Sequence, residues 1–265
     1  MLAQLGRRLL PLAAAGTGAG MTYAAMQRRS SSSTVAPPPL SPLQALSREA
    51  RDASSPRYRV PFEDHGDFQA SVEEAEAQHP GSYPNVTGDQ MRNAFNVYQG
   101  ARNPSLGSMV LGRLVPDSNE QQPGIDDPLR ANFGEMNESS AGGSVMNSPQ
   151  WNLLMNDALV LGTAHSGQGT YMASPRTPGN ILSRQHGMTV TGRELTGLRA
   201  FGHEFVQGHP ALGEATEVSD PEAARSATFG RYQHVLRGSR GADGALRSDV
   251  LDELTAPPRS VGGHE

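Results

Sequence analysis

The segment Thr191–Pro210 (TGRELTGLRAFGHEFVQGHP) carries the clearest local structural signals in the chain. Thr191 and Glu194 have the spacing of a capping box, in which each side chain accepts a hydrogen bond from the other's backbone N–H. Apolar residues follow at intervals of three and four, which is typical of a half-buried helix. Glycine can adopt the left-handed conformation that closes a helix, and proline has no N–H to continue one. The sequence therefore predicts a helix that ends at Gly208.

Two ionisable residues, His203 and Glu204, lie in the last turns of this predicted helix. They begin the sequence HEFVQ, which is similar to the zinc motif H-E-x-x-H, where two histidines one turn apart bind the metal and the glutamate activates water. Gln207 stands where the motif has its second histidine, and an amide is a far weaker zinc ligand than an imidazole. Two interpretations stay open: a site with His203 and Gln207 as ligands and Glu204 as base, or a structural helix end.

A second helix is predicted from Ser219 to Leu236, with Asp220 as its cap and Pro221 at its first position. Glu222 lies in its first turn, downstream of the His-Glu pair. One large class of zinc peptidases places its third ligand, a glutamate, on such a helix. The alternative is an ion pair within the helix or a favourable interaction with the helix dipole, which is the more common role of an acid in a first turn.

The composition indicates that part of the chain lies outside any core. Apolar residues make up 36% and aromatic residues 5%, with 30 glycines and 20 prolines, which is unusual for a fully globular chain. We expect residues 1–85 to be a disordered leader and linker, although a short helix is plausible over 41–53. Residues 86–238 are predicted to form the folded domain. Residues 239–265 are then a polar tail with one short helix at 248–254.

Within the predicted domain, helices alternate with short strand-like runs. Thr87 is placed to cap a helix that ends near Asn103, and residues 107–115 form an apolar segment of ambiguous type. Residues 116–149 are predicted to be a long loop. The runs at 158–162 (ALVLG) and 169–173 (GTYMA) favour a β-hairpin. The predicted class is therefore α+β, mainly helical with a small hairpin or sheet.

Charge and residue usage exclude several classes of function. The net charge of -5 argues against a general nucleic-acid binder, for which a basic face is expected. Cysteine is absent, so any metal site must use histidines and carboxylates. The apolar stretch at 9–26 is interrupted by glycines and a proline, which predicts no stable membrane insertion.

The first 48 residues lack Asp and Glu and contain several arginines and a serine run. This composition suits a type III secretion signal and equally a mitochondrial or plastid transit peptide; a Sec signal peptide ranks third. All 22 basic residues are arginines. Lysine is the acceptor for ubiquitin, and its avoidance is a pattern associated with bacterial proteins delivered into eukaryotic cytosol. Codon bias in a high-GC genome is the alternative explanation.

Residues from about 86 to 247 resemble the zinc metallopeptidase effectors that pathogens inject through type III secretion. The resemblance rests on the order of a helix with an apolar segment (MRNAFNVYQGARNPSLGSMVLGRL), a Gly-rich hairpin (GTAHSGQGTYMASP), the His-Glu helix and a segment with arginines (HVLRGSRGADGALR). It implies a zincin-like domain with zinc as cofactor, His203 as a metal ligand and Glu204 as the water-activating base. The family has a histidine where this chain has Gln207, so whether the protein is an active enzyme stays open.

The sequence leaves three functions open. The first is hydrolysis of a host protein by zinc-bound water, with His203 and Glu222 holding the metal. The second is a peptidase scaffold that works by binding a host protein without metal, which Gln207 favours. The third is a structural subunit imported into an organelle. The first two imply a protein that is secreted and delivered into a host cell, and the third a protein of a mitochondrion or plastid.

Overall fold

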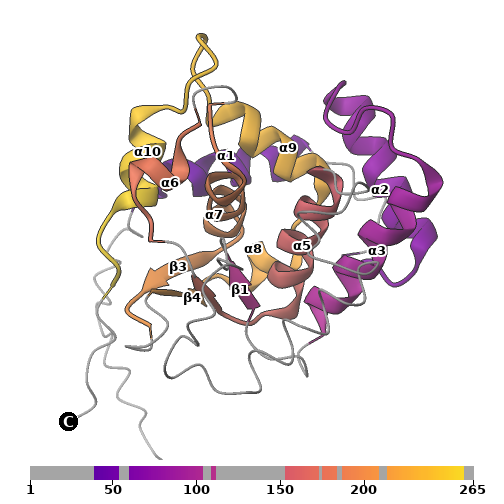
Figure 1. Cartoon of the computed structure of the whole chain (residues 1–265), viewed down its shortest axis with the longest axis horizontal. Helices are drawn as coiled ribbons and strands as arrows, with labels where there is room; N and C mark the ends of the chain where they lie inside the picture. Colours follow the sequence, from indigo (N-terminus) through magenta and orange to yellow (C-terminus); the bar gives the residue numbers. More distant parts are fainter. Residues whose placement is uncertain are drawn as a thin grey trace, which may run out of the picture. The chain divides into compact units, whose positions relative to one another are not determined.

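The protein is built mainly of helices, with one small sheet (Figure 1). The computed structural model describes residues 39–53, 60–103, 109–111, 153–172, 175–183, 187–208 and 214–259. The helices are α1 (Pro42–Ala53), α2 (His65–Gln78), α3 (Gly88–Arg102), α5 (Leu153–Ser166), α6 (Pro178–Ile181), α7 (Val190–Ala200), α8 (Pro221–Arg225), α9 (Phe229–Gly238) and α10 (Ser248–Thr255). The strands are β1 (Met109–Leu111), β2 (Thr170–Met172), β3 (His203–Val206) and β4 (Ala215–Val218). The predicted α+β class with a small sheet is confirmed.

Side-chain caps explain where several helices begin. Thr87 and Gln90 form a complete capping box at the start of α3, which confirms the predicted cap. Asp220 accepts hydrogen bonds from two backbone N–H groups of α8, as predicted. The single helix predicted over 219–236 is wrong, because α8 ends at Arg225 and Thr228 caps a separate helix, α9.

Helix α7 lies among the other helices and contacts α1, α5, α6, α9, α10 and β3 (Figure 1). Its cap is Thr189, whose hydroxyl accepts from the N–H of Gly192 at 3.0 Å. The capping box predicted for Thr191 and Glu194 is therefore wrong, and the Glu194 side chain points into the protein interior instead. Capping moves two residues upstream because Thr189 has the extended backbone of a cap residue.

The predicted helix is also wrong in its second half, because the chain reverses at Gly202. This glycine has φ +83°, and a Cβ there would lie 2.4 Å from the carbonyl oxygen of Asp220. The left-handed conformation ends the helix well before Gly208. Residues His203–Val206 continue as strand β3, paired antiparallel with β4 from His203↔Val218 to Val206↔Ala215. The HEFVQ sequence is therefore extended, and its residues do not share a helix.

The sheet has the strand order β1-β2-β4-β3, with β1 and β2 parallel and the other pairs antiparallel. Residues 169–173 contain strand β2, as predicted. The partner strand predicted at 158–162 lies instead within helix α5, which is buried on nearly every side. A helix without a polar face has no 3.6-residue hydrophobic period, so its apolar run is not distinguishable from a buried strand by pattern alone.

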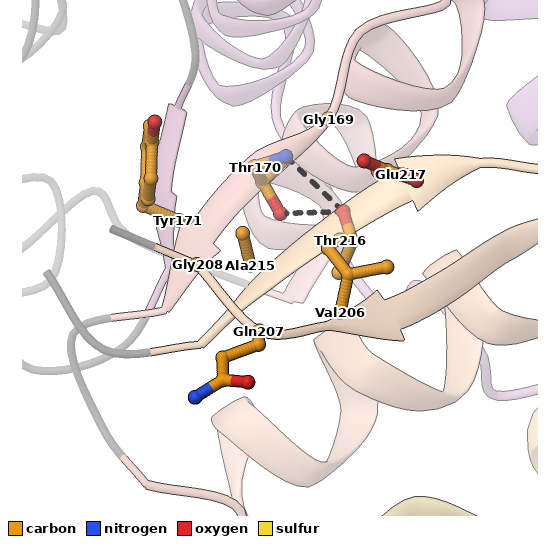
Figure 2. A pocket seen from close by; sticks show the side chains of 9 residues that line it. All are labelled: Gly169, Thr170, Tyr171, Val206, Gln207, Gly208, Ala215, Thr216 and Glu217. Atoms are coloured by element: carbon orange, nitrogen blue, oxygen red, sulfur yellow. Dashed lines mark hydrogen bonds between the residues drawn. The ribbon is translucent and has the colours of Figure 1, made fainter. Parts of the chain in front are cut away.

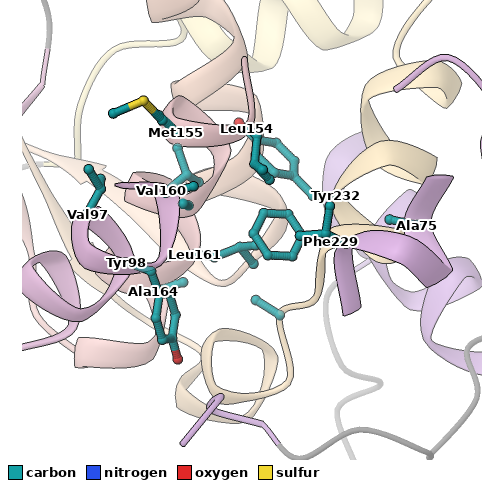
Figure 3. Close-up of a cluster of buried hydrophobic side chains, with 14 of the residues drawn as sticks. Ala75, Val97, Tyr98, Leu154, Met155, Val160, Leu161, Ala164, Phe229 and Tyr232 are labelled. Carbon is teal, nitrogen blue, oxygen red and sulfur yellow. The ribbon is translucent and has the colours of Figure 1, made fainter. Parts of the chain in front are cut away.

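Two clusters of buried apolar side chains form the core. The larger lies between α2, α3, α5 and α9, where aromatic rings such as Tyr98, Phe229 and Tyr232 pack against leucines and alanines of α5 (Figure 3). The smaller joins α1, α7, α10 and β3 through residues that include Leu43, Leu195 and Phe205. The helices thus enclose α5 and α7, and the sheet adjoins the smaller cluster.

Parts of the predicted leader and tail belong to this folded unit. Leu43 of α1 and Phe68 of α2 are 0% exposed, so the predicted boundary at residue 85 is wrong. Leu254 of α10 is also 0% exposed, within the predicted polar tail. A few large apolar side chains spaced along amphipathic helices suffice for burial even where the average composition is polar. Residues 1–38 and the predicted loop at 116–149 lie outside the described residues.

Two leucines near the start of α1 test this boundary. Leu43→Ala is expected to lower the free energy of unfolding by about 2–5 kcal/mol, because a fully buried leucine leaves a cavity. Leu40→Ala is the matched control, since Leu40 is 47% exposed, and it should change stability by less than about 0.5 kcal/mol. Urea unfolding measures both. Equal, small effects would show that α1 does not contribute to the core.

Candidate functional site

His203, the first residue of β3, is fully buried. Its Nδ1 lies 3.0 Å from the Oγ1 of Thr216 on the neighbouring strand, and its Nε2 is buried with no hydrogen-bond partner among the described residues. Burial lowers the pKa of His203 to about 4, because the interior disfavours the charged imidazolium. The ring is therefore neutral at pH 7 and faces the interior.

Glu204 lies on the opposite face of the same strand, because successive strand residues alternate. Its Oε2 is 3.4 Å from the Nε of Arg259, and the same guanidinium is 3.3 Å from Oε2 of Glu217 on β4. The Glu204 side chain is 32% exposed. The predicted base and the predicted ligand His203 are thus on different faces of the sheet.

Gln207 follows the end of β3 and is exposed. Its backbone N–H donates to the carbonyl oxygen of Arg259 at 3.2 Å. In extended chain, positions 203 and 207 lie about 13 Å apart, whereas on a helix they would be neighbours one turn apart. The predicted pairing of His203 and Gln207 on one helix face is therefore wrong, and the two residues do not form the metal-binding pair of the motif.

Glu222, the predicted third ligand, is exposed in the first turn of α8, where Asp220 caps the helix. Throughout the part of the chain that the structure describes, no three His, Asp or Glu residues are grouped so that they could hold a metal ion. A catalytic zinc site needs three protein ligands around one ion. The predicted set of His203, Gln207 and Glu222 with Glu204 as base does not fit zinc in this arrangement.

A pocket of about 370 Å³ opens between β2 and β4, near the end of β3 (Figure 2). In the part of the chain that the structure describes, the register between the two strands has one residue pair, Tyr171↔Ala215. Further along, the hydroxyl of Thr216 enters the gap, where it accepts from the N–H of Thr170 at 3.1 Å and lies 3.0 Å from the Thr170 hydroxyl. The residues that line the pocket are Gly169, Thr170, Tyr171, Val206, Gln207, Gly208, Ala215, Thr216 and Glu217.

Gly169 allows the close approach of β2 and β4 beside this pocket. A Cβ at this position would lie 2.1 Å from the carbonyl oxygen of Thr216, a distance that no side chain tolerates. Thr216 therefore links the pocket to the interior, because its one hydroxyl contacts both Thr170 and the buried His203. The arrangement offers hydroxyl, amide and carboxylate groups to a ligand.

A buried polar network connects the helices away from the pocket. Arg193 of α7 donates two hydrogen bonds to Asp157 of α5, each of 2.6 Å. The hydroxyl of Tyr83 and the amide of Gln233 donate to the same carboxylate at 2.6 Å and 3.0 Å. No sequence motif indicated this network, because its members are distant in the chain and each is unremarkable alone.

Glu194, next to Arg193 on α7, is buried, and its Oε2 has no hydrogen-bond partner among the described residues. Burial, followed by the negative charge of Asp157, raises the pKa of Glu194 to about 8. The carboxyl is therefore protonated in the folded protein at neutral pH. Protonated Glu194 contributes stability that is fully present when the pH is below the ordinary pKa of a carboxyl group. This stability is lost as the pH rises through about 8.

His165 of α5, which lies between the two runs predicted to form a hairpin, is buried in the helical core. Its Nε2 donates to the carbonyl oxygen of Ala227 at 2.9 Å, which leaves Nδ1 to accept from the Tyr98 hydroxyl at 2.8 Å. Burial lowers the pKa of His165 to about 4. Both ring nitrogens are occupied by the protein, which indicates a structural role.

Comparison with protein-family models, with curated proteins and with solved structures found no match. Among the helices of the described residues, none is both long enough and apolar enough to cross a membrane.

The buried carboxyl of Glu194 predicts a pH dependence of stability. Between pH 5 and pH 8 the native state holds a proton on Glu194 that the unfolded chain releases, so stability falls as pH rises, by at most about 1.4 kcal/mol per unit. Glu194→Gln has no such proton and should gain stability relative to the wild type over this range. Urea unfolding at several pH values measures the difference.

Below pH 6.5 the titration of His165 and His203 acts in the opposite direction, so that stability rises with pH. This effect is the same in the wild type and in Glu194→Gln, and it cancels in the difference between their free energies of unfolding. Glu217→Gln, at an exposed carboxylate, serves as the matched control and should follow the wild type. A constant difference between Glu194→Gln and the wild type from pH 5 to pH 8 would contradict the burial of a protonated Glu194.

Proposed function

We propose that this protein acts by binding another protein and not by zinc-dependent hydrolysis. The observation that carries this proposal is the separation of the motif residues. His203 faces the interior and contacts Thr216, Glu204 pairs with Arg259 on the other face, and Gln207 lies at the rim of the pocket. Zinc hydrolysis needs a ligand set and a base around one point, whereas binding needs only an accessible and chemically distinct surface.

The outer face of the sheet provides such a surface. Glu204 and Glu217 lie opposite each other on β3 and β4, and both are partly exposed. The pocket between β2 and β4 lies beside them, with Gln207 at its rim. Carboxylates next to a polar pocket suit a basic or hydrogen-bonding segment of a protein partner.

We also propose that the partner is a host protein that the chain meets after delivery from a bacterium. This proposal is supported by the absence of lysine among 22 basic residues and by the acid-free, arginine- and serine-rich first 48 residues. Import into a mitochondrion or plastid is the alternative that the same leader composition favours.

A zinc titration tests the choice between binding and hydrolysis. The wild type and Gln207→His, both freed of metal, are titrated with zinc and followed by calorimetry. Because position 207 is not one helical turn from His203, Gln207→His should bind zinc no more tightly than the wild type. Gln207→Leu is the control for loss of the amide. Stoichiometric zinc in the wild type that is lost in His203→Gln would overturn the proposal.

A reporter fusion tests delivery. Residues 1–50 fused to a reporter enzyme are expected to direct it through a type III apparatus into a host cell. The control replaces the arginines at 7, 8, 28 and 29 with glutamate, which removes the acid-free character of the leader. A reporter that instead enters mitochondria or plastids supports the organelle alternative, and one that reaches neither destination contradicts both.

A further inference from the structure

The outer edge of strand β3 is covered by the chain's own residues 257–259, which we name the strap. Arg259 forms a parallel bridge with Val206. Its N–H donates to the carbonyl oxygen of Phe205 at 2.9 Å, and its carbonyl oxygen accepts from the N–H of Gln207 at 3.2 Å. The strap therefore occupies the position that an additional strand of the sheet would take.

The strap is an incomplete strand partner. In a parallel ladder, the residue two positions before Arg259 would donate its N–H to the carbonyl oxygen of His203. That residue is Pro257, which has no N–H. The guanidinium of Arg199 donates to the His203 carbonyl instead, at 3.0 Å. A strand without proline would make hydrogen bonds along this edge that the strap does not make.

The side-chain contacts of the strap are also weak. Arg259 reaches Glu204 and Glu217 at 3.4 Å and 3.3 Å, and its side chain is 62% exposed. Exposed ion pairs of this kind contribute little to stability. They do show, however, that the two carboxylates on the outer face accept one guanidinium from a chain that runs along the β3 edge.

We propose that the β3 edge is a docking site for an extended, arginine-bearing segment of a partner protein, and that the strap is a displaceable substitute for it. The incoming segment runs parallel to β3, its backbone pairs with Phe205 and Gln207, and its arginine replaces Arg259 between Glu204 and Glu217. Strand addition supplies affinity through backbone hydrogen bonds, and the carboxylates supply specificity.

The pocket beside Gln207 is available to a neighbouring side chain of the segment. This inference rests on the proposed binding function and names the chemistry of its partner.

Binding of a designed peptide to the full-length chain tests the proposal. The probe is a fluorescein-labelled peptide of sequence TVTRTVT, and the control probe has glutamine in place of the arginine. Arg259→Ala weakens the attachment of the strap, which in the wild type competes with the peptide for the β3 edge of the same molecule. This variant should therefore bind the arginine peptide roughly five- to tenfold more tightly than the wild type. Fluorescence anisotropy gives the affinities, and NMR signals of the Phe205 and Gln207 amides locate the peptide.

The carboxylates are tested in the Arg259→Ala background. The double substitution Glu204→Gln and Glu217→Gln should abolish the preference for the arginine peptide over the glutamine peptide. Each of the two peptides should still shift the NMR signal of the Gln207 amide. Peptide affinity that is equal in Arg259→Ala and wild type, or the absence of any shift at Phe205 and Gln207, would overturn the proposal. So would dimerisation of Arg259→Ala, because the edge would then accept a second copy of the chain. The zinc titration is independent, so failure of the docking site is distinguishable from failure of the binding function.

Discussion

The fold depends on the buried ion pair between Asp157 and Arg193, because it joins the two helices that all others surround. Arg193 places two donors on one carboxylate, and Tyr83 and Gln233 add hydrogen bonds from the connection after α2 and from α9. Breaking a buried pair leaves an unpaired charge and typically costs about 3–5 kcal/mol, although an apolar replacement of both partners can be neutral. The network therefore mainly specifies how the four segments meet. Glu194 stays protonated next to it because burial, and then the negative charge of Asp157, disfavour a carboxylate that has no cationic partner of its own among the described residues.

Local signals predicted the helices that begin at strong caps or bury one face. Thr87 and Asp220 cap helices as expected, and the helices at 41–53 and 248–254 have apolar residues on one side. The strand predicted at 158–162 is wrong because burial of α5 on nearly all sides removes the 3.6-residue hydrophobic period that indicates a helix. The predicted helix extends over residues 203–206 because the reversal at Gly202, whose carbonyl oxygen accepts from the N–H groups of Ser219 and Asp220, is a contact outside the local sequence pattern. Pairing with β4 is likewise a tertiary contact that no local pattern encodes.

The structure does not bring the residues of the predicted zinc site, His203, Glu204, Gln207 and Glu222, together around one point among the described residues. His203 begins strand β3 and Gln207 follows its end, and alternation along the strand places His203 and Glu204 on opposite faces. A motif implies a site only when it lies on the kind of secondary structure that brings its spaced residues together. Thr170 and Thr216 were not predictable, because their importance comes from the divergence of β2 and β4 and not from any residue type in sequence. The same divergence creates the pocket.

The buried arginines provide a structural reason for the use of arginine in place of lysine. Arg176 donates to the carbonyl oxygens of Leu254 and Ala256 and pairs with Glu214, so one guanidinium holds the end of α10 to the residue that precedes β4. Arg231 in the same way joins α9 to Ser47 of α1. A lysine ammonium at such a position is a point charge on a flexible stem and does not present the planar fork that reaches several acceptors at once. At these positions arginine is demanded by folding itself, whatever the codon usage of the genome or the advantage of escaping ubiquitin.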